Sequence, residues 1–184
     1  DVILFNAKLK IALVPSAPAL SGAEVELVSE IGRETRLKQS LAALKKEYDY
    51  ILIDCPPSLS LLTVNGLVAA ESVIIPVQCE YLALEGLGQL AQTISRVRSA
   101  LNTSLSIRGL VMTMFDARTS LSMQVVDEVR KHFPGKVFKS IIPRSVRLAE
   151  APSHGVPISA FAPSSAGAQA YYALAEELLK GDQK

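Results

Sequence analysis

Hydrophobic residues occur in two alternating kinds of run along the chain. The short runs are rich in β-branched residues and apolar on consecutive positions, which is typical of strands buried on both faces of a parallel sheet. These runs are Lys10–Pro15, Tyr50–Asp54, Ser72–Val77, Arg108–Met114 and Val137–Ile142. Longer stretches predict helices at Glu34–Glu47, Leu61–Ala70, Glu85–Leu101, Ser120–Phe133 and Ser165–Leu179.

Repeated alternation of strand and helix predicts an α/β fold, with a doubly wound, mostly parallel sheet flanked by helices. Ligands of such sheets bind beyond the carboxyl ends of the strands. Candidate site segments are therefore Asp54–Ser58, Val77–Tyr81, Met114–Thr119 and Pro143–Glu150.

One predicted helix carries a clear apolar stripe. Leu87, Leu90, Ile94, Val97 and Leu101 recur at steps of three and four residues. Such a stripe predicts that the helix packs along the sheet.

Length and composition narrow the class of protein. The chain has 184 residues, which favours one domain; we expect it to span residues 1–180, with a frayed tail at 181–184. Hydrophobic residues make up 49% and charged residues 20%, which excludes disorder as the main state. The net charge of +1 provides no basic field over the whole protein, so any polyanion must contact a local patch.

Cysteine use and hydropathy favour a cytoplasmic protein. Two cysteines are too few for a disulfide framework, and the sequence shows no signal peptide. The apolar runs are shorter than the roughly 20 residues that cross a bilayer. We therefore expect no membrane span and no membrane partner.

Asp54 is the first residue with a chemical interpretation. The run YILID ends a predicted strand on a carboxylate, the form of a Walker B element that holds nucleotide-bound magnesium through water. Buried strands also end in Asp for capping reasons, so this pattern leaves both interpretations open. Pro56 and Pro57 follow, and two fixed φ angles make a rigid turn suited to a phosphate-binding loop.

Several ordered blocks along the chain resemble the ParA/Soj family of Walker-type partition ATPases, which belongs with MinD and the nitrogenase iron protein. The blocks are LSGAEVELV (20–28), YDYILIDCPPSLSLLTVNGL (48–67), IIPVQCEYLALEGLGQL (74–90), MTMFDARTSLSMQVVDEV (112–129), IIPRSVRLAEAPSHGVPI (141–158) and GAQAYYALAEELL (167–179). The resemblance runs over essentially the whole chain.

The resemblance implies an ATPase that uses ATP and Mg²⁺. Asp54 matches the magnesium-associated carboxylate of the family. Pro143, Arg144 and Ser145 lie where relatives line the adenine pocket, and Ser145 replaces the usual Asn. A plain turn is the alternative interpretation of Pro143.

The resemblance also implies a DNA-binding cycle. Arg118 and Arg147 match family positions that contact double-stranded DNA without sequence preference, and Arg suits phosphate oxygens. ATP would close a homodimer that holds DNA, and a ParB-like protein would stimulate hydrolysis and release. The expected location is the cytoplasm, in association with the nucleoid.

The chain lacks one family hallmark. Relatives begin with a P-loop of the form KGGVGKT, and no G-x-x-x-x-G-K-[ST] occurs here. The chain resembles the carboxyl-terminal two-thirds of a ParA-like protein, so we assign no catalytic residue and expect the chain alone to be inactive. Because a central strand would lose its neighbour, we also expect it to be poorly soluble or partnered.

Two alternatives stay open at this point. One is a MinD-like membrane-cycling ATPase, which needs a basic amphipathic helix at the carboxyl end; the segment 173–180 is short and acidic on its polar side. The other is a non-enzymatic module that lacks the P-loop and dimerises with a full-length relative.

Overall fold

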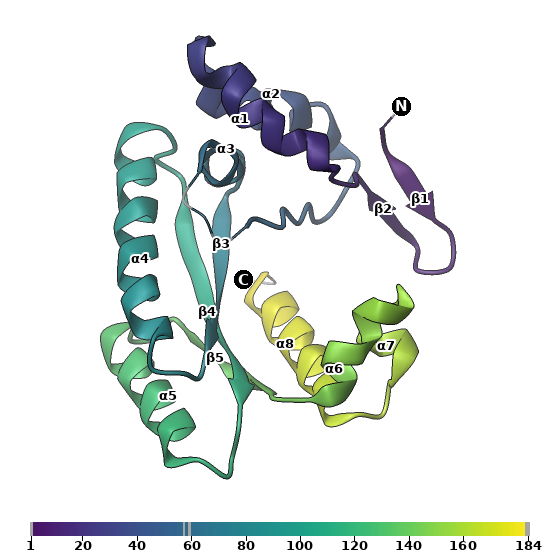
Figure 1. Ribbon diagram of the computed structural model, residues 1–184, viewed down its shortest axis with the longest axis vertical. Coiled ribbons are helices and arrows are strands. Elements are labelled where there is room, and N and C mark those ends of the chain that lie inside the picture. Colours follow the sequence, from purple (N-terminus) through teal and green to yellow (C-terminus); the bar gives the residue numbers. More distant parts are fainter. Residues whose placement is uncertain (1, 57, 59, 183–184) are drawn as a thin grey trace. The chain divides into compact units, whose positions relative to one another are not determined.

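The computed structural model describes residues 2–56, 58 and 60–182. The chain divides into two compact units, Asp1–Ala69 and Ala70–Lys184. Both are drawn in Figure 1, and each is described by itself below.

The second unit contains a parallel sheet. Its strands are β3 (Ser72–Gln78), β4 (Ser106–Phe115) and β5 (Val137–Pro143), in the order β3-β4-β5. Both pairings are parallel. The sequence predicted all three strands to within two residues at each end, and the parallel sheet confirms the predicted fold class.

Helices cover both faces of this sheet. α4 (Ala83–Ala100) and α5 (Ser120–His132) lie on one face, and α8 (Ala166–Asp182) lies on the other (Figure 1). Right-handed crossovers explain the shared face, since β3, β4 and β5 are added in one direction across the sheet. The short helices α6 (Val146–Glu150), η5 (Ala151–His154) and α7 (Ile158–Phe161) connect β5 to α8.

The core of the second unit follows the alternation of side chains along β4. Val111 packs with Ile142 of β5 and Leu174 of α8. Successive strand residues point to opposite faces, so the fully buried Leu110 and Met112 face the side that α4 and α5 cover. This two-sided burial explains why the sequence run is apolar at consecutive positions.

The apolar stripe of α4 is largely confirmed. Leu87, Ile94 and Val97 are buried, and Leu90 is partly buried. Leu101 is 43% exposed because the helix ends at Ala100 and Leu101 caps it.

β5 is irregular where it meets β4. Leu110 pairs with Val137 and Met112 with Ile141, so the register shifts between them. Gly109 of β4 faces Phe138 at this irregularity: a Cβ on Gly109 would lie 2.4 Å from the Phe138 ring. Glycine is therefore required for the close approach of the ring to the β4 backbone.

Glu177 of α8 binds the irregular stretch of β5. Its carboxylate accepts hydrogen bonds from the backbone N–H of Lys139 (2.8 Å) and of Ser140 (3.1 Å), and from the Ser140 hydroxyl (3.0 Å). Burial raises the pKa of Glu177, but these hydrogen bonds outweigh it and the pKa lies below its ordinary value. The contact joins α8 to an edge strand whose N–H groups would otherwise lack partners.

The first unit begins with a hairpin that pairs β1 (Leu4–Asn6) antiparallel with β2 (Ile11–Leu13). The side chain of Asn6 accepts a hydrogen bond from the Leu9 backbone in the connecting turn. The predicted strand Lys10–Pro15 is therefore real but shorter, and it is not a member of the parallel sheet. Its partner is local because a short turn brings β1 back beside it.

Short helices and one longer helix follow in the first unit. They are η1 (Pro18–Gly22), α1 (Ala23–Glu26), η2 (Leu27–Ser29), η3 (Arg33–Thr35), α2 (Arg36–Leu41), η4 (Leu44–Lys46) and α3 (Leu61–Ala69). The predicted helix Leu61–Ala70 is confirmed by α3. The predicted helix Glu34–Glu47 is instead divided into three short helices, η3, α2 and η4. α2 contains no fully buried residue, and a helix in a protein is stabilised mainly by packing of its apolar face.

Buried Asn65 holds the helices of the first unit together. Its amide oxygen accepts a hydrogen bond from Leu37 N–H at 3.1 Å, and its amide nitrogen donates to the carbonyls of Arg33 (2.8 Å) and Leu61 (3.1 Å). One side chain thus connects η3, α2 and α3.

The predicted strand Tyr50–Asp54 is wrong for this structure. The segment has no assigned secondary structure, and within the described residues it forms no strand ladder. Leu52 is 87% exposed, although the pattern predicted burial on both faces. A hydrophobic run becomes a strand only when a neighbouring strand takes its backbone hydrogen bonds.

The carboxyl end differs from the predicted frayed tail. α8 includes Gly181 and Asp182, and Asp182 forms an ion pair with Arg108; residues 183 and 184 lie outside the described residues. In the part of the chain that the structure describes, no helix combines the length and apolar character needed to cross a bilayer.

Candidate functional site

The carboxyl ends of β3, β4 and β5 meet at one edge of the sheet, because the strands are parallel. Backbone hydrogen bonds continue past the strand ends. Cys79 N–H donates to Thr113 O at 2.9 Å, and Arg144 N–H donates to Phe115 O at 2.9 Å. The segments that leave this edge therefore start from fixed positions.

An ion pair joins two of these segments. Arg144, which follows β5, donates from Nη2 to Oε1 of Glu80, which follows β3, at 2.7 Å. Both side chains are 50% exposed. The guanidinium is thus oriented at the sheet edge while it remains open to solvent.

A second pair lies in the loop after β4. Asp116 accepts hydrogen bonds from Arg118 Nε (2.9 Å), Nη2 (2.7 Å) and the Arg118 backbone N–H (3.0 Å). These bonds, with the nearby charge of Arg144, hold the pKa of Asp116 well below its usual range. The Asp116 side chain is 19% exposed and that of Arg118 is 86% exposed.

The start of α5 fixes this loop. Thr119 is the N-cap of α5 and accepts from the Ser122 N–H. The Asp116 N–H donates to the Ser122 hydroxyl at 3.2 Å, and the Thr119 hydroxyl donates to the Asp116 carbonyl at 3.1 Å. Asp116 is thereby tied to the helix through its backbone, independently of Arg118.

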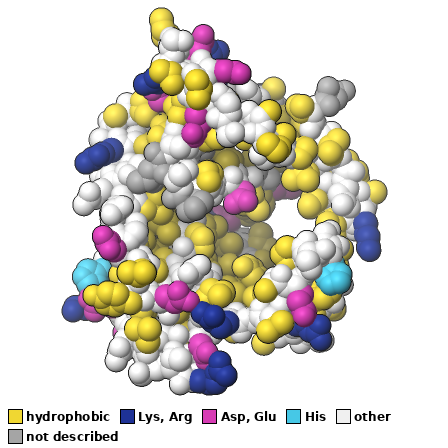
Figure 2. Space-filling view, viewed as in Figure 1, with side chains coloured by type: hydrophobic (Ala, Val, Ile, Leu, Met, Phe, Trp, Pro, Cys, Tyr) yellow, Lys and Arg dark blue, Asp and Glu magenta, His cyan; other side chains and the backbone are white. Residues whose placement is uncertain are grey.

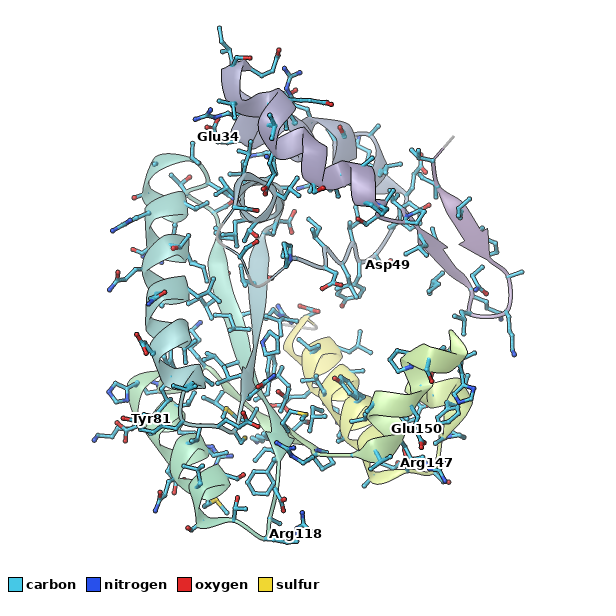
Figure 3. The ribbon with its side chains drawn as sticks, in the orientation of Figure 1. Glu34, Asp49, Tyr81, Arg118, Arg147 and Glu150 are labelled. Atoms are coloured by element: carbon cyan, nitrogen blue, oxygen red, sulfur yellow. The ribbon has the colours of Figure 1, made fainter. Side chains whose placement is uncertain are left out.

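Arg147 lies on α6, beyond Pro143, Arg144 and Ser145. It donates to Glu150 at 3.0 Å, one turn along the same helix. Figure 3 labels Arg118 on the loop that follows β4 and Arg147 with Glu150 on α6. Both arginines belong to the second unit, and each contacts a carboxylate nearby in the chain.

The sheet edge is hollowed on either side of Arg144. One hollow of ≈ 380 Å³ is lined by Phe115, Asp116, Ala117, Arg118, Pro143, Arg144 and Val146. A second, of similar size, is lined on its apolar side by Tyr81, Leu82, Met114 and Leu121. Figure 2 shows acidic side chains among the basic ones on the visible face, rather than a continuous basic patch.

Met114, at the end of β4, has a φ of +55°. A non-glycine residue rarely adopts this left-handed conformation, and such positions cluster at functional sites. The sheet also changes register between Met112 and Phe115. The strand is therefore distorted where it enters the candidate site.

Asp54 belongs to the first unit, where it lies exposed in the irregular segment before Pro56. Pro57 lies outside the described residues. Among the residues that are described, no group of three His, Cys, Asp or Glu side chains could hold a metal ion. Asp54 alone could supply only one carboxylate to such an ion.

Sequence reasoning missed the carboxylate partners. The structure brings Pro143, Arg144 and Arg118 to one sheet edge, and each arginine there has an acidic partner, Glu80 or Asp116, that was not singled out. A signal existed for Asp116, since it lies two residues before Arg118. The partnership of Glu80 with Arg144 joins residues 64 positions apart, so no local pattern contains it.

Comparisons with known proteins agree on one family. A family model described as an AAA domain matches residues 1–107. The sporulation initiation inhibitor protein Soj of Bacillus subtilis is 55% identical over 178 residues, which cover 97% of this chain and 70% of that protein. The chromosome-partitioning ATPase Soj of Treponema pallidum is 57% identical over 169 residues, which cover 92% of this chain and 67% of that protein.

A solved structure is similar over the entire chain. Cobyrinic acid a,c-diamide synthase from Mycobacterium smegmatis, with bound ADP and magnesium, superposes with a TM-score of 0.84 at 37% identity. The match covers 100% of this chain and 67% of that protein. The chain thus spans about two thirds of the length of the proteins that it matches.

Proposed function

Because the chain belongs to the Soj/ParA family of chromosome-partitioning ATPases, we propose that its protein binds and hydrolyses ATP with Mg²⁺ and couples this cycle to non-specific DNA binding. The observation that carries the proposal is the arrangement of arginines at the carboxyl edge of the sheet. We propose further that residues 1–180 work together as one ATPase domain.

The residues after β5 fit the base side of a nucleotide. Pro143 and Val146 offer apolar contact beside Arg144 in the hollow at the sheet edge. Arg144 is oriented by Glu80 and is half exposed, so its remaining N–H groups are available to a ligand. Pro143 and Arg144 are therefore the residues that would line the nucleotide pocket. Ser145, the N-cap residue of α6, does not line the hollow, and its place in the pocket is proposed from the family resemblance alone.

Asp54 is the residue that would hold magnesium. Mg²⁺ commonly keeps several waters and binds through one or two carboxylates together with substrate phosphates. A single exposed carboxylate fits that mode, whereas it would not fit an all-protein metal site. Bound ATP would supply the phosphoanhydride bond that water cleaves; the part played by this chain is to bind and orient.

Arg118 and Arg147 are the proposed DNA contacts. Both are exposed, at 86% and 63% of their side-chain surface, and both lie on segments that leave the carboxyl edge of the sheet. Two planar guanidinium groups suit phosphate oxygens without reading bases. With a net charge of only +1, a local pair of this kind is the form that DNA binding would take.

Membership of the family supports a proposal for assembly and partners. ATP would close two copies of the protein as a homodimer, and a ParB-like protein would stimulate hydrolysis and DNA release. The proposed location is the cytoplasm, in association with the nucleoid.

Hydrolysis tests the nucleotide part of the proposal. The experiment uses the protein with any residues that precede Asp1 in its gene. Asp54→Ala should lower Mg²⁺-dependent phosphate release by more than about 10-fold, because the metal loses its carboxylate. The matched control Asp49→Ala changes an exposed aspartate five positions upstream and should retain activity. Equal activity in both variants would contradict the assignment of Asp54.

Salt dependence tests the DNA part. The logarithm of the binding constant for a duplex should fall linearly with the logarithm of salt concentration, with a slope of about −0.9 per phosphate contacted. A binding constant that does not change with salt concentration would contradict the proposed DNA binding. The absence of binding in the presence of ATP and Mg²⁺ would contradict it as well.

A further inference from the structure

The contact between Asp116 and Arg118 bears on how Arg118 is oriented, and this inference rests on the proposed DNA binding. Arg118 is the most exposed of the arginines at the sheet edge for which ion pairs are described, with 86% of its side chain open. An exposed arginine normally samples many rotamers, and that freedom is lost when it binds a phosphate. In this structure the freedom is already restricted, because Asp116 binds both Nε and Nη2 of the guanidinium.

We propose that Asp116 is a positioning residue for DNA binding, whose carboxylate holds the Arg118 guanidinium with its remaining N–H groups directed to a phosphate. A guanidinium has five N–H donors in a rigid fork. Asp116 takes one from Nε and one from Nη2, which leaves about three for a ligand. Figure 3 shows Arg118 at the loop that leaves the sheet edge, where its side chain is exposed.

The support for Asp116 is independent of Arg118. Its N–H is bound by the Ser122 hydroxyl and its carbonyl by the Thr119 hydroxyl, both in or beside the first turn of α5. The carboxylate is 19% exposed and stays charged, since its pKa lies well below the usual range. The guanidinium is therefore held by a carboxylate whose backbone is fixed at the start of α5.

A carboxylate beside an arginine could instead oppose DNA by repelling the phosphate. That repulsion acts through solvent, where a high dielectric constant and salt both weaken it. The hydrogen bonds between Asp116 and Arg118 are direct contacts at 2.7–2.9 Å, and salt weakens such a contact less than it weakens the longer-range repulsion. Orientation therefore outweighs repulsion at this position, and removing the carboxylate should weaken DNA binding.

Arg147 provides a contrast within the same unit. Its partner Glu150 lies one turn away on a five-residue helix and makes a single contact at 3.0 Å. Glu150 is 41% exposed, so the pair resembles an ordinary surface ion pair that contributes little. We therefore assign the positioning role to Asp116 alone.

The test is a fluorescence anisotropy titration of a short labelled duplex over a series of salt concentrations. It uses the protein with any residues that precede Asp1 in its gene, together with ATP and Mg²⁺. Asp116→Asn should bind about 3- to 10-fold more weakly at every salt concentration, with the slope unchanged because Arg118 still contacts its phosphate. Arg118→Ala should bind more weakly and also reduce the slope by about 0.9.

The double variant distinguishes positioning from an independent effect. Adding Asp116→Asn to Arg118→Ala should cause no further loss, because the carboxylate then has no guanidinium to orient. Glu176→Gln is the charge-matched control: it removes one negative charge from an exposed side chain of α8 and should leave affinity within about twofold of wild type.

Arg118→Lys keeps the proposal testable if Asp116→Asn does not fold. It retains the charge and every backbone contact of Asp116, but an ammonium lacks the fork that Asp116 holds. Its slope should match wild type while its affinity falls.

Several results would overturn the proposal. Equal or tighter binding by Asp116→Asn, additive losses in the double variant, or full affinity in Arg118→Lys would each do so while leaving the proposed DNA binding intact. If the wild-type protein binds no DNA, the proposed function fails, and the positioning role fails with it.

Discussion

Nη2 of Arg144 lies 2.7 Å from Oε1 of Glu80, so one ion pair spans the sheet edge from the segment after β5 to the loop after β3. β4 lies between those two strands. The pair therefore ties together two segments that leave the sheet at different points. Its exposure suggests that it orients a side chain more than it stabilises the fold.

Glu80→Gln should separate these two effects. Because both partners are half exposed, the free energy of unfolding should fall by less than about 1 kcal/mol. The affinity for ATP should fall several-fold, since the Arg144 guanidinium is no longer held. Urea unfolding and titration with a fluorescent ATP analogue measure the two quantities. Unchanged ATP affinity would show that nucleotide binding does not depend on this pair.

Glu177→Gln should destabilise the protein by about 1.5–3 kcal/mol, the range for hydrogen bonds to a charged group. The carboxylate accepts from the backbone of Lys139 and from both donors of Ser140, and a neutral amide can replace it only in part. Urea unfolding measures the change. Glu176→Gln, at the neighbouring exposed position, should change stability by less than about 0.5 kcal/mol. Similar changes in the free energy of unfolding for both variants would mean that the contact of Glu177 with β5 does not stabilise the protein.

Acid should remove the contribution of Glu177. Its folded-state pKa lies below the ordinary value of 4.5, so the unfolded state binds the proton first as the pH falls. The contribution is complete above pH 4.5 and is lost as the pH falls through the folded-state pKa. Unfolding at a series of pH values should show wild type and Glu177→Gln converging below pH 4.5. A constant difference down to the lowest pH would contradict this assignment.

Gly109→Ala should destabilise the second unit by about 1–3 kcal/mol, as overpacked cores do. The new Cβ would lie 2.4 Å from Phe138 Cε2, so the ring or the β4 backbone must move. Phe138→Leu in the same protein should recover part of the loss by removing the ring. Gly86→Ala is the control, since nothing lies within 4 Å of that Cβ on α4 and alanine favours a helix. Thermal unfolding compares all four proteins.

The parallel sheet could be predicted from the sequence because each of its strands is a short run of consecutive apolar residues. All three strands are apolar runs followed or flanked by helices with apolar stripes, and each feature lies within one short window. Burial on both faces holds for β4, whereas β3 alternates buried and exposed residues. Tyr50–Asp54 carries the same local signal, yet it pairs with none of the described strands. A short stretch of sequence shows only which residues are hydrophobic. A strand also requires a neighbouring strand that pairs with its backbone N–H and C=O groups.

The candidate site also has features that the sequence predicts and features that only the structure shows. The sequence by itself determined which arginines are candidates for ligand contact, because Arg118, Arg144 and Arg147 lie just beyond strand ends or within blocks that resemble a known family. Only the tertiary structure decided how the sheet-edge arginines are held, by Glu80 from a distant loop and by Asp116 through the cap of α5. The orientation of Arg144 depends on a contact between distant segments that the chain folds together, and the order of residues alone does not contain it. Asp116 is close to Arg118 in the sequence, but its hydrogen bonds to the start of α5 appear only in the folded chain.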